Sequence, residues 1–126
     1  MTATSEAPAL RRGDVVLAAL PFVTATTRSK VRPAVIVQND IGNRFSPNVI
    51  VASISSQLPS RAYPTDLVVR HDSPEATGTG LDRDSVVQAA VILTIPRATV
   101  VRRLGRFEAA ALLAIDQCLK VSLGLT

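Results

Sequence analysis

The stretch Val31-Arg32-Pro33-Ala34-Val35-Ile36-Val37-Gln38-Asn39-Asp40 does most to decide the predicted fold. Its centre, Ala34–Gln38, is a short apolar run bounded by Pro33 and Asn39, which predicts a β-strand. This strand is apolar on both faces. Because such a strand must be covered on both sides, the stretch predicts a sheet with a second layer on each face.

Short apolar segments separated by turn-forming residues continue on both sides of this stretch. We expect loops or turns over Pro21–Lys30, Asn39–Asn48, Gln57–Pro64 and His71–Gly80, where Gly, Pro, Asn, Asp, Ser and Thr gather. The predicted strands are Asp14–Leu20, Ala34–Gln38, Val49–Ser55, Thr65–Arg70, Ser85–Ala89, Val91–Ile95 and Val100–Arg106. The Ala89–Val91 region is expected to break the chain between two of these strands.

Only the segment Glu108–Leu123 has a helical pattern. Its apolar stripe has steps of three and four residues and consists of Leu112, Ile115, Leu119 and Leu123. Gly124 is a suitable stop for this helix. Many short strands and one terminal helix predict a mainly β fold, a compact barrel or curled sheet in which the helix covers one face and a second subunit could cover another.

Length and composition indicate a single domain, and the charge is compatible with an acidic partner. The chain has 126 residues, of which 47% are hydrophobic, and we expect residues 1–10 to form a flexible arm and 11–126 one domain. The net charge is +4, which favours nucleic acid or an acidic protein segment as partner. Aromatic residues make up only 3%, which argues against a base-stacking platform.

The expected location is the cytoplasm. Cys118 is the only cysteine, which excludes an internal disulfide and fits a reducing compartment. No apolar run is long enough for a membrane span.

An ordered set of motifs carries a family resemblance. In order, they are Arg12-Gly13-Asp14-Val15-Val16, Val31 to Asp40, Ile41-Gly42-Asn43-Arg44-Phe45-Ser46-Pro47, Val49-Ile50-Val51-Ala52, Tyr63-Pro64-Thr65, Asp84-Ser85-Val86-Val87, Leu93-Thr94-Ile95 and Leu123-Gly124-Leu125. Together they resemble the MazF/PemK toxin family from about Arg12 to Leu125. The resemblance implies an SH3-like barrel with a C-terminal helix, of the kind shared with the gyrase poison CcdB.

The same resemblance implies a function. The chain is expected to be the toxin of a type II toxin–antitoxin system, a homodimer that cleaves single-stranded RNA at a short sequence without a metal or other cofactor. Its expected protein partner is a MazE-like antitoxin whose acidic C-terminal segment fills the RNA groove.

Two residues match the catalytic positions of the family. Arg32 matches the arginine of the Val-Arg-Pro motif, where a guanidinium would stabilise the negative charge that develops on the phosphoryl oxygens. Pro33 should hold Arg32 in an extended conformation. Ser55 aligns with a threonine of the family; it keeps the hydroxyl but loses the methyl group that restricts the side chain. The neighbouring Ser56 is expected to point to the opposite face.

Further residues match positions near bound RNA or carry charge. The resemblance assigns RNA contacts to Asn39 and Ser85, and the loop cations Arg28 and Lys30 could guide phosphates. Strand alternation predicts that Arg102 and Arg106 share one face of the last strand and that Arg103 lies on the other. His71 is the only histidine, which excludes a two-histidine mechanism within one subunit, and Cys118 is expected to pack in the core.

Two features keep alternatives open. No acidic residue lies in Val23–Lys30, where some family members have one, so no general base is evident. Ser55 replaces the family's threonine. A CcdB-like inhibitor of gyrase and a catalytically silent module that binds antitoxin therefore remain alternatives to the endoribonuclease.

Overall fold

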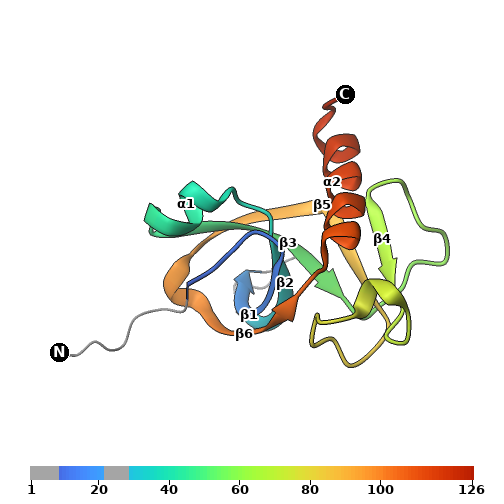
Figure 1. Cartoon of the computed structure of the whole chain (residues 1–126), viewed down its shortest axis with the longest axis horizontal. Coiled ribbons are helices and arrows are strands. Elements are labelled where there is room, and N and C mark those ends of the chain that lie inside the picture. The colour runs from blue at the N-terminus through green and yellow to red at the C-terminus, as the bar shows by residue number, and fades with distance from the viewer. Residues whose placement is uncertain (1–8, 22–28) are drawn as a thin grey trace.

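The computed structural model describes residues 9–21 and 29–126. Within these residues, six antiparallel strands form one sheet in the order β4-β5-β3-β2-β1-β6 (Figure 1). The strands are β1 (Asp14–Pro21), β2 (Ser29–Ile36), β3 (Asn48–Ser55), β4 (Asp66–Val69), β5 (Ser85–Pro96) and β6 (Val100–Arg106). The helices are α1 (Asp40–Phe45), α2 (Ala109–Leu123) and the short 3-10 turns η1 (Pro74–Ala76) and η2 (Arg97–Thr99).

The two edges of the sheet are joined by loop backbone rather than by strand pairing. The Arg106 amide of β6 donates to the Gly78 carbonyl oxygen at 2.8 Å, in the loop that follows β4. Gly105 lies so close that a Cβ there would overlap the backbone of Gly78 and Thr79. The mainly β fold with a C-terminal helix is therefore confirmed. The barrel takes the form of a curled sheet that strand pairing does not close.

The curl comes from irregular pairing of long strands. β3 pairs with β5 as Ala52↔Ile92 and then as Ser53↔Gln88, so residues 89–91 of β5 bulge out of the ladder. A bulge of this kind bends a strand and increases its twist. The break predicted near Ala90 is therefore a bulge within one continuous strand, not a gap between two strands.

Two hydrophobic cores lie on the two faces of the sheet. The first includes Val35, Ile54, Phe107 and Ile115 and is covered by α2, which stands beside β4 and β5 in Figure 1. The second core belongs to the curled sheet and has only apolar buried members: Leu10, Val16, Ala18, Leu20, Ala34, Ile36, Val49, Val51 and Ile95. The two-faced burial predicted for the second strand is thus confirmed.

Helix α2 agrees with the predicted range except that it begins one residue later, at Ala109. Glu108 is its N-cap, and Gly124 ends it with a φ of +71°, a conformation that suits glycine. Ile115 and Leu119 of the predicted stripe are buried, but Leu123 is 59% exposed because the helix extends past the sheet. Cys118 is buried, as predicted.

Three expectations on the N-terminal half need correction. The turn region 39–48 contains a helix, α1, which is stabilised by the Asn39 side chain accepting from the Gly42 amide at 2.8 Å. Strand β2 begins at Ser29 rather than at Ala34, because it pairs with β1 as far as Ser29. Leu10, expected in the flexible arm, is buried in the second core. Residues 1–8 of that arm lie outside the described range.

Candidate active site

The candidate site lies where β2 and β3 separate. Their pairing runs from Ile36↔Val51 to Ala34↔Ser53 and stops there, although β2 continues to pair with β1 as far as Ser29. The same register continued by two residues places Arg32 opposite Ser55. Pro33 lies at the point of separation, where its missing N–H costs no ladder bond to β3.

A pocket of about 320 Å³ opens at this separation, and we call it the Ser55 pocket. It is lined by residues of β1, β2, β3 and β5 and of the chain just after β3: Leu20, Pro21, Arg32, Ser53, Ile54, Ser55, Gln57, Gln88, Val91 and Leu93. Arg32 and Ser55 are both half-buried. The backbone N–H of Gln57 donates to the Ser55 hydroxyl oxygen at 3.0 Å, which orients the Ser55 side chain and leaves its proton for donation to a substrate. The structure thus brings the two predicted catalytic residues into one pocket.

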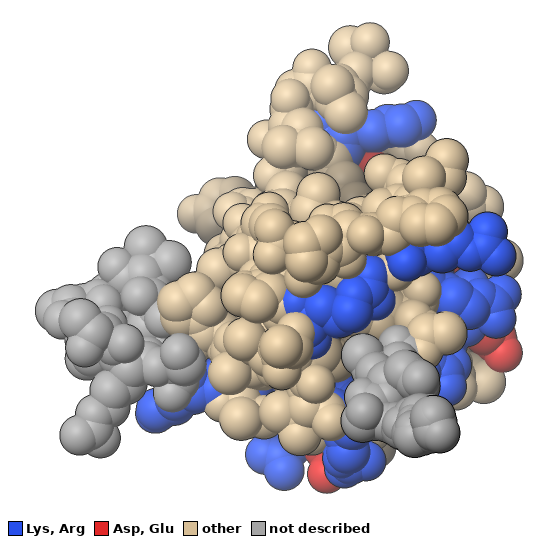
Figure 2. All heavy atoms as spheres, turned by 90° about the vertical axis from the view of Figure 1, so that its left-hand side faces the viewer, with Lys and Arg blue, Asp and Glu red and all other residues tan. Residues whose placement is uncertain are grey.

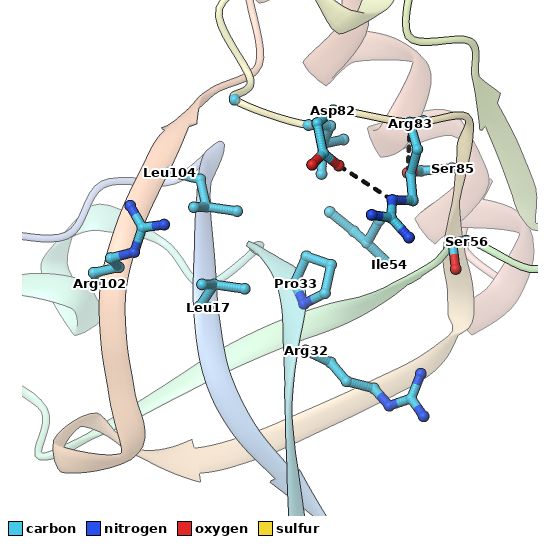
Figure 3. Close-up of a pocket in the computed structure, with 12 residues that line it drawn as sticks. Leu17, Arg32, Pro33, Ile54, Ser56, Asp82, Arg83, Ser85, Arg102 and Leu104 are labelled. Carbon is cyan, nitrogen blue, oxygen red and sulfur yellow. Dashed lines mark hydrogen bonds and ion pairs between the residues drawn. The ribbon is translucent and has the colours of Figure 1, made fainter.

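A second pocket of about 320 Å³ shares Arg32 and Ile54 with the first, and we call it the Asp82 pocket. Its lining is Leu17, Arg32, Pro33, Ile54, Ser56, Gly80, Leu81, Asp82, Arg83, Ser85, Arg102 and Leu104. Figure 3 shows Asp82 and Arg83 on the loop before β5 and Ser85 at the start of β5, across the pocket from Pro33 and Leu17. Ser55 lines one pocket and Ser56 the other.

The residues expected to contact RNA occupy different places. Ser85 is 2% exposed, lines the Asp82 pocket and donates to the Arg83 carbonyl oxygen at 3.0 Å. Lys30 is exposed on β2 and lines neither pocket. Asn39 caps α1 and also lies outside both pockets. Arg28 falls outside the described residues. The structure therefore brings Ser85 to Arg32 but does not bring Asn39 or Lys30 there.

The loop before β5 is anchored through Asp84. The His71 amide and the His71 ring both contact Asp84 Oδ1 at 2.9 Å, and Arg70 reaches Oδ2 at 3.1 Å. These bonds, the His71 amide first, lower the pKa of Asp84 to about 2. The hydrogen bond to Asp84 in turn raises the pKa of His71 above its usual value of 6.5. Asp84 is thus a charged anchor that fixes the loop beside the Asp82 pocket.

The three arginines of β6 have two different surroundings. Arg103 and Arg106 form ion pairs with the buried Asp14 at 3.1 and 3.3 Å. The prediction that they lie on opposite faces is wrong, because the β1–β6 register shifts between Val15 and Val16 and resets the alternation. Arg102 is exposed and lines the Asp82 pocket.

Several pocket residues were not predicted from the sequence. Gln57 and Gln88 line the Ser55 pocket, and Asp82 and Arg83 line the other. The signal available for the second pair is the charged run of residues 82–84 directly before a strand that is apolar on both faces. The glutamines have no such signal, because their place depends on the β5 bulge and on the turn after β3.

The pockets suit an anionic ligand. Among the described residues that line them there are three arginines and one aspartate. On the molecular face shown in Figure 2, Lys and Arg side chains are also far more prominent than Asp and Glu. A guanidinium and a hydroxyl in a half-buried pocket can stabilise charge that develops on a phosphoryl group. Cys118 is not suited to nucleophilic chemistry, since burial raises the pKa of its thiol.

Within residues 9–21 and 29–126, no group of three or more His, Cys, Asp or Glu side chains is arranged to hold a metal ion. No helix in this part of the chain is long and apolar enough to cross a membrane.

The fold and these pockets define a class: a small, mainly β protein with a basic, hydroxyl-bearing pocket at the ends of two separating strands. The family described as the PemK-like, MazF-like toxin of type II toxin–antitoxin systems matches residues 11–123. The chain belongs to this family, in agreement with the resemblance of its motifs.

Characterised relatives and a solved structure are similar over nearly the whole chain. Endoribonuclease EndoA of Bacillus subtilis (strain 168) is 36% identical over 116 residues, which cover 92% of this chain and 96% of EndoA. Endoribonuclease MazF of Staphylococcus epidermidis is 38% identical over 116 residues, with 92% of each chain covered. A mycobacterial endoribonuclease solved in complex with its cognate antitoxin has the same fold, with a TM-score of 0.72 at 24% identity over 94% of this chain and 98% of that one.

Proposed function

We propose that this protein is a toxin that cleaves single-stranded RNA at a preferred sequence, without a metal ion. The observation that supports this most directly is that Arg32 and Ser55 line the same pocket, just beyond the last paired residues of β2 and β3. The endoribonuclease activity named for EndoA and MazF, two relatives that match nearly the whole chain, points to the same reaction.

The chemistry follows from these two side chains. The 2′ oxygen of the RNA attacks the adjacent phosphorus while the bond to the 5′ oxygen breaks. The 2′-OH proton is lost, the departing oxygen becomes a 5′-OH, and a 2′,3′-cyclic phosphate remains, which hydrolysis converts to a 3′-phosphate. Arg32 stabilises the negative charge on the phosphoryl oxygens, and the Ser55 hydroxyl donates to one of them. The described lining of the Ser55 pocket holds no carboxylate, so electrostatic stabilisation is proposed to supply most of the rate.

The proposal is tested with purified protein and a long single-stranded RNA in EDTA. We expect cuts at a preferred sequence, and Arg32→Ala should lose about 10²-fold or more of the cleavage rate, the scale for removal of one charge-stabilising donor. Arg44→Ala is the matched control, because Arg44 is an exposed arginine on α1 that lines neither pocket. An RNA with a 2′-deoxy sugar at the cut site should resist cleavage.

The outcomes separate the alternatives. Intact RNA under all conditions would reject the enzyme and favour a silent module that binds antitoxin. Undiminished cutting by Arg32→Ala would reject the role of Arg32. The named activity of the relatives favours RNA cleavage over inhibition of gyrase.

We also propose a homodimer and an antitoxin partner in the cytoplasm. Leu113 and Leu123 of α2 and Leu125 just after it are more than half exposed, and a second copy could cover these apolar side chains. The related mycobacterial structure contains a cognate antitoxin, and the arginines of the Asp82 pocket are complementary to an acidic segment. Light scattering that gave only a monomer mass at micromolar concentration would reject the dimer.

A further inference from the structure

Asp82 is the only acidic residue among the described residues that line the two pockets. Its side chain is 81% exposed, so burial does not prevent it from meeting a ligand. A carboxylate beside a bound phosphodiester is repelled by it, which weakens RNA binding. Its Arg83 partner, at 3.2 Å, and the other pocket arginines offset that repulsion. The Asp82 carboxylate favours binding only of a ligand that donates a hydrogen bond to it.

The loop that carries Asp82 is held in place on both sides. Before it, the Thr79 hydroxyl donates to the Ala76 carbonyl oxygen at 2.7 Å and accepts from the Leu81 amide at 3.2 Å. After it, Ser85 binds the Arg83 carbonyl oxygen, and Asp84 is anchored by His71 and Arg70. A hydrogen-bonding group on such a fixed loop loses little entropy when it binds, which suits selection of a ligand.

The two pockets are adjacent because Arg32 and Ile54 line both. If Arg32 contacts the phosphate at the cleaved bond, a nucleotide joined to that phosphate can enter the Asp82 pocket. The partly exposed apolar side chains of Leu17 and Leu104 offer a surface for the flat faces of a base, and Asp82 and Arg83 lie across the pocket from Leu17 (Figure 3).

We propose that the Asp82 pocket binds the base next to the cleaved bond and that Asp82 selects a base with an exocyclic amino group. Cytosine, adenine and guanine carry such a group and can donate to a carboxylate. Uracil has no amino group, and its single N–H lies between two carbonyl oxygens that repel a carboxylate. This inference rests on the proposed RNA cleavage and adds to it a residue that determines specificity.

The test uses two sets of four RNAs that differ only in the base before, or after, the cleaved bond. We compare kcat/KM for the parent protein, Asp82→Asn and the control Asp72→Asn, which removes the same charge from an exposed residue outside both pockets. In the set whose varied base enters the Asp82 pocket, the parent should prefer the bases with an exocyclic amino group over uracil. Asp82→Asn should reduce that preference by about 5-fold or more, the lower end of the discrimination given by a specific base contact. Asp72→Asn should leave it unchanged.

Binding to the same RNAs with a 2′-deoxy sugar at the cleaved bond provides a readout that does not need cleavage. The preference should be present there in the parent and reduced in Asp82→Asn. An unchanged preference in Asp82→Asn would overturn base selection, and so would an equal loss of kcat on all four RNAs, which indicates a role in the reaction itself. A parent that bound the RNAs with this preference but cut none would overturn the proposed cleavage and support base selection.

Discussion

The two ends of the β2–β3 pair differ in almost every physical respect. At the paired end, Ala34, Val35 and Ile36 are 0% exposed and pack into the two cores. At the separated end of the same strand, Val31 is 55% exposed and Arg32 lines two pockets. The buried, paired end of β2 and β3 stabilises the fold. The candidate site lies at the other end, where the two strands no longer form hydrogen bonds with each other.

The largest effect on function is expected at the separated end. Ser55→Ala should reduce the rate of RNA cleavage about 10²-fold, because it removes a donor to the phosphoryl group. It should leave the free energy of unfolding within about 1 kcal/mol, since the side chain is only half-buried. Ser60→Ala is the matched control and should retain the activity, because Ser60 is exposed and lines neither pocket. Single-turnover cleavage assays and denaturant unfolding measure both quantities. Equal losses from the two variants would contradict the assignment of Ser55.

The next effect is expected on stability at the paired end. Val35→Ala should reduce the free energy of unfolding by about 2 kcal/mol, because two buried methyl groups are lost and a cavity remains. Val31→Ala, the same change four residues earlier on β2, should cost less than about 1 kcal/mol because Val31 is exposed. Urea unfolding of both variants tests the comparison. Similar losses from the two would show that the separated end also contributes to the core.

The smallest effect concerns pH and the loop beside the separated end. The raised pKa of His71 means that its contribution to stability is fully present below pH 6.5 and is lost as pH rises through the folded-state value. The lowered pKa of Asp84 means that its contribution is present above pH 3.8 and is lost as pH falls toward about 2. The loop is therefore best anchored between about pH 4 and 6.5.

This pH prediction can be checked by NMR titration, because His71 is the only histidine. The ring should titrate above 6.5, and Asp84→Asn should return its pKa toward that value. A His71 pKa that did not respond to Asp84→Asn would remove the anchor from the description of the loop.

Much of the fold followed from local patterns in the sequence. The alternation and turn residues located β1, β3, β4 and β6 to within about two residues, and the apolar stripe located α2. The pattern failed where tertiary contacts decide the structure. Helix α1 contains Gly42 and Asn43, which favour turns. It forms because the Asn39 side chain caps it and because the buried side-chain amide of Asn43 donates to the backbone carbonyl oxygen of Gln38.

The site was predictable in part. The family motifs pointed to Arg32 and Ser55, and the structure brings both into one pocket. The role of Asp14 as buried partner of Arg103 and Arg106 could not be predicted, because it depends on a register shift between β1 and β6 that leaves no mark on the sequence. The place of Asp82 in a pocket that Arg32 also lines could not be predicted either, since it depends on contacts of residues 78–80 with β6.

Pro33 has a consequence for how such a cleft can change. Pro33 has no amide hydrogen and lies where the pairing of β2 and β3 ends, so a small shift of the backbone cannot extend the hydrogen-bond ladder toward Arg32. The width of the opening is thus set by main-chain chemistry, whereas its chemical preference is set by the side chains around it. Substitutions of the side chains around the opening would change which ligand binds, while the separation of β2 and β3 at Pro33 stays the same.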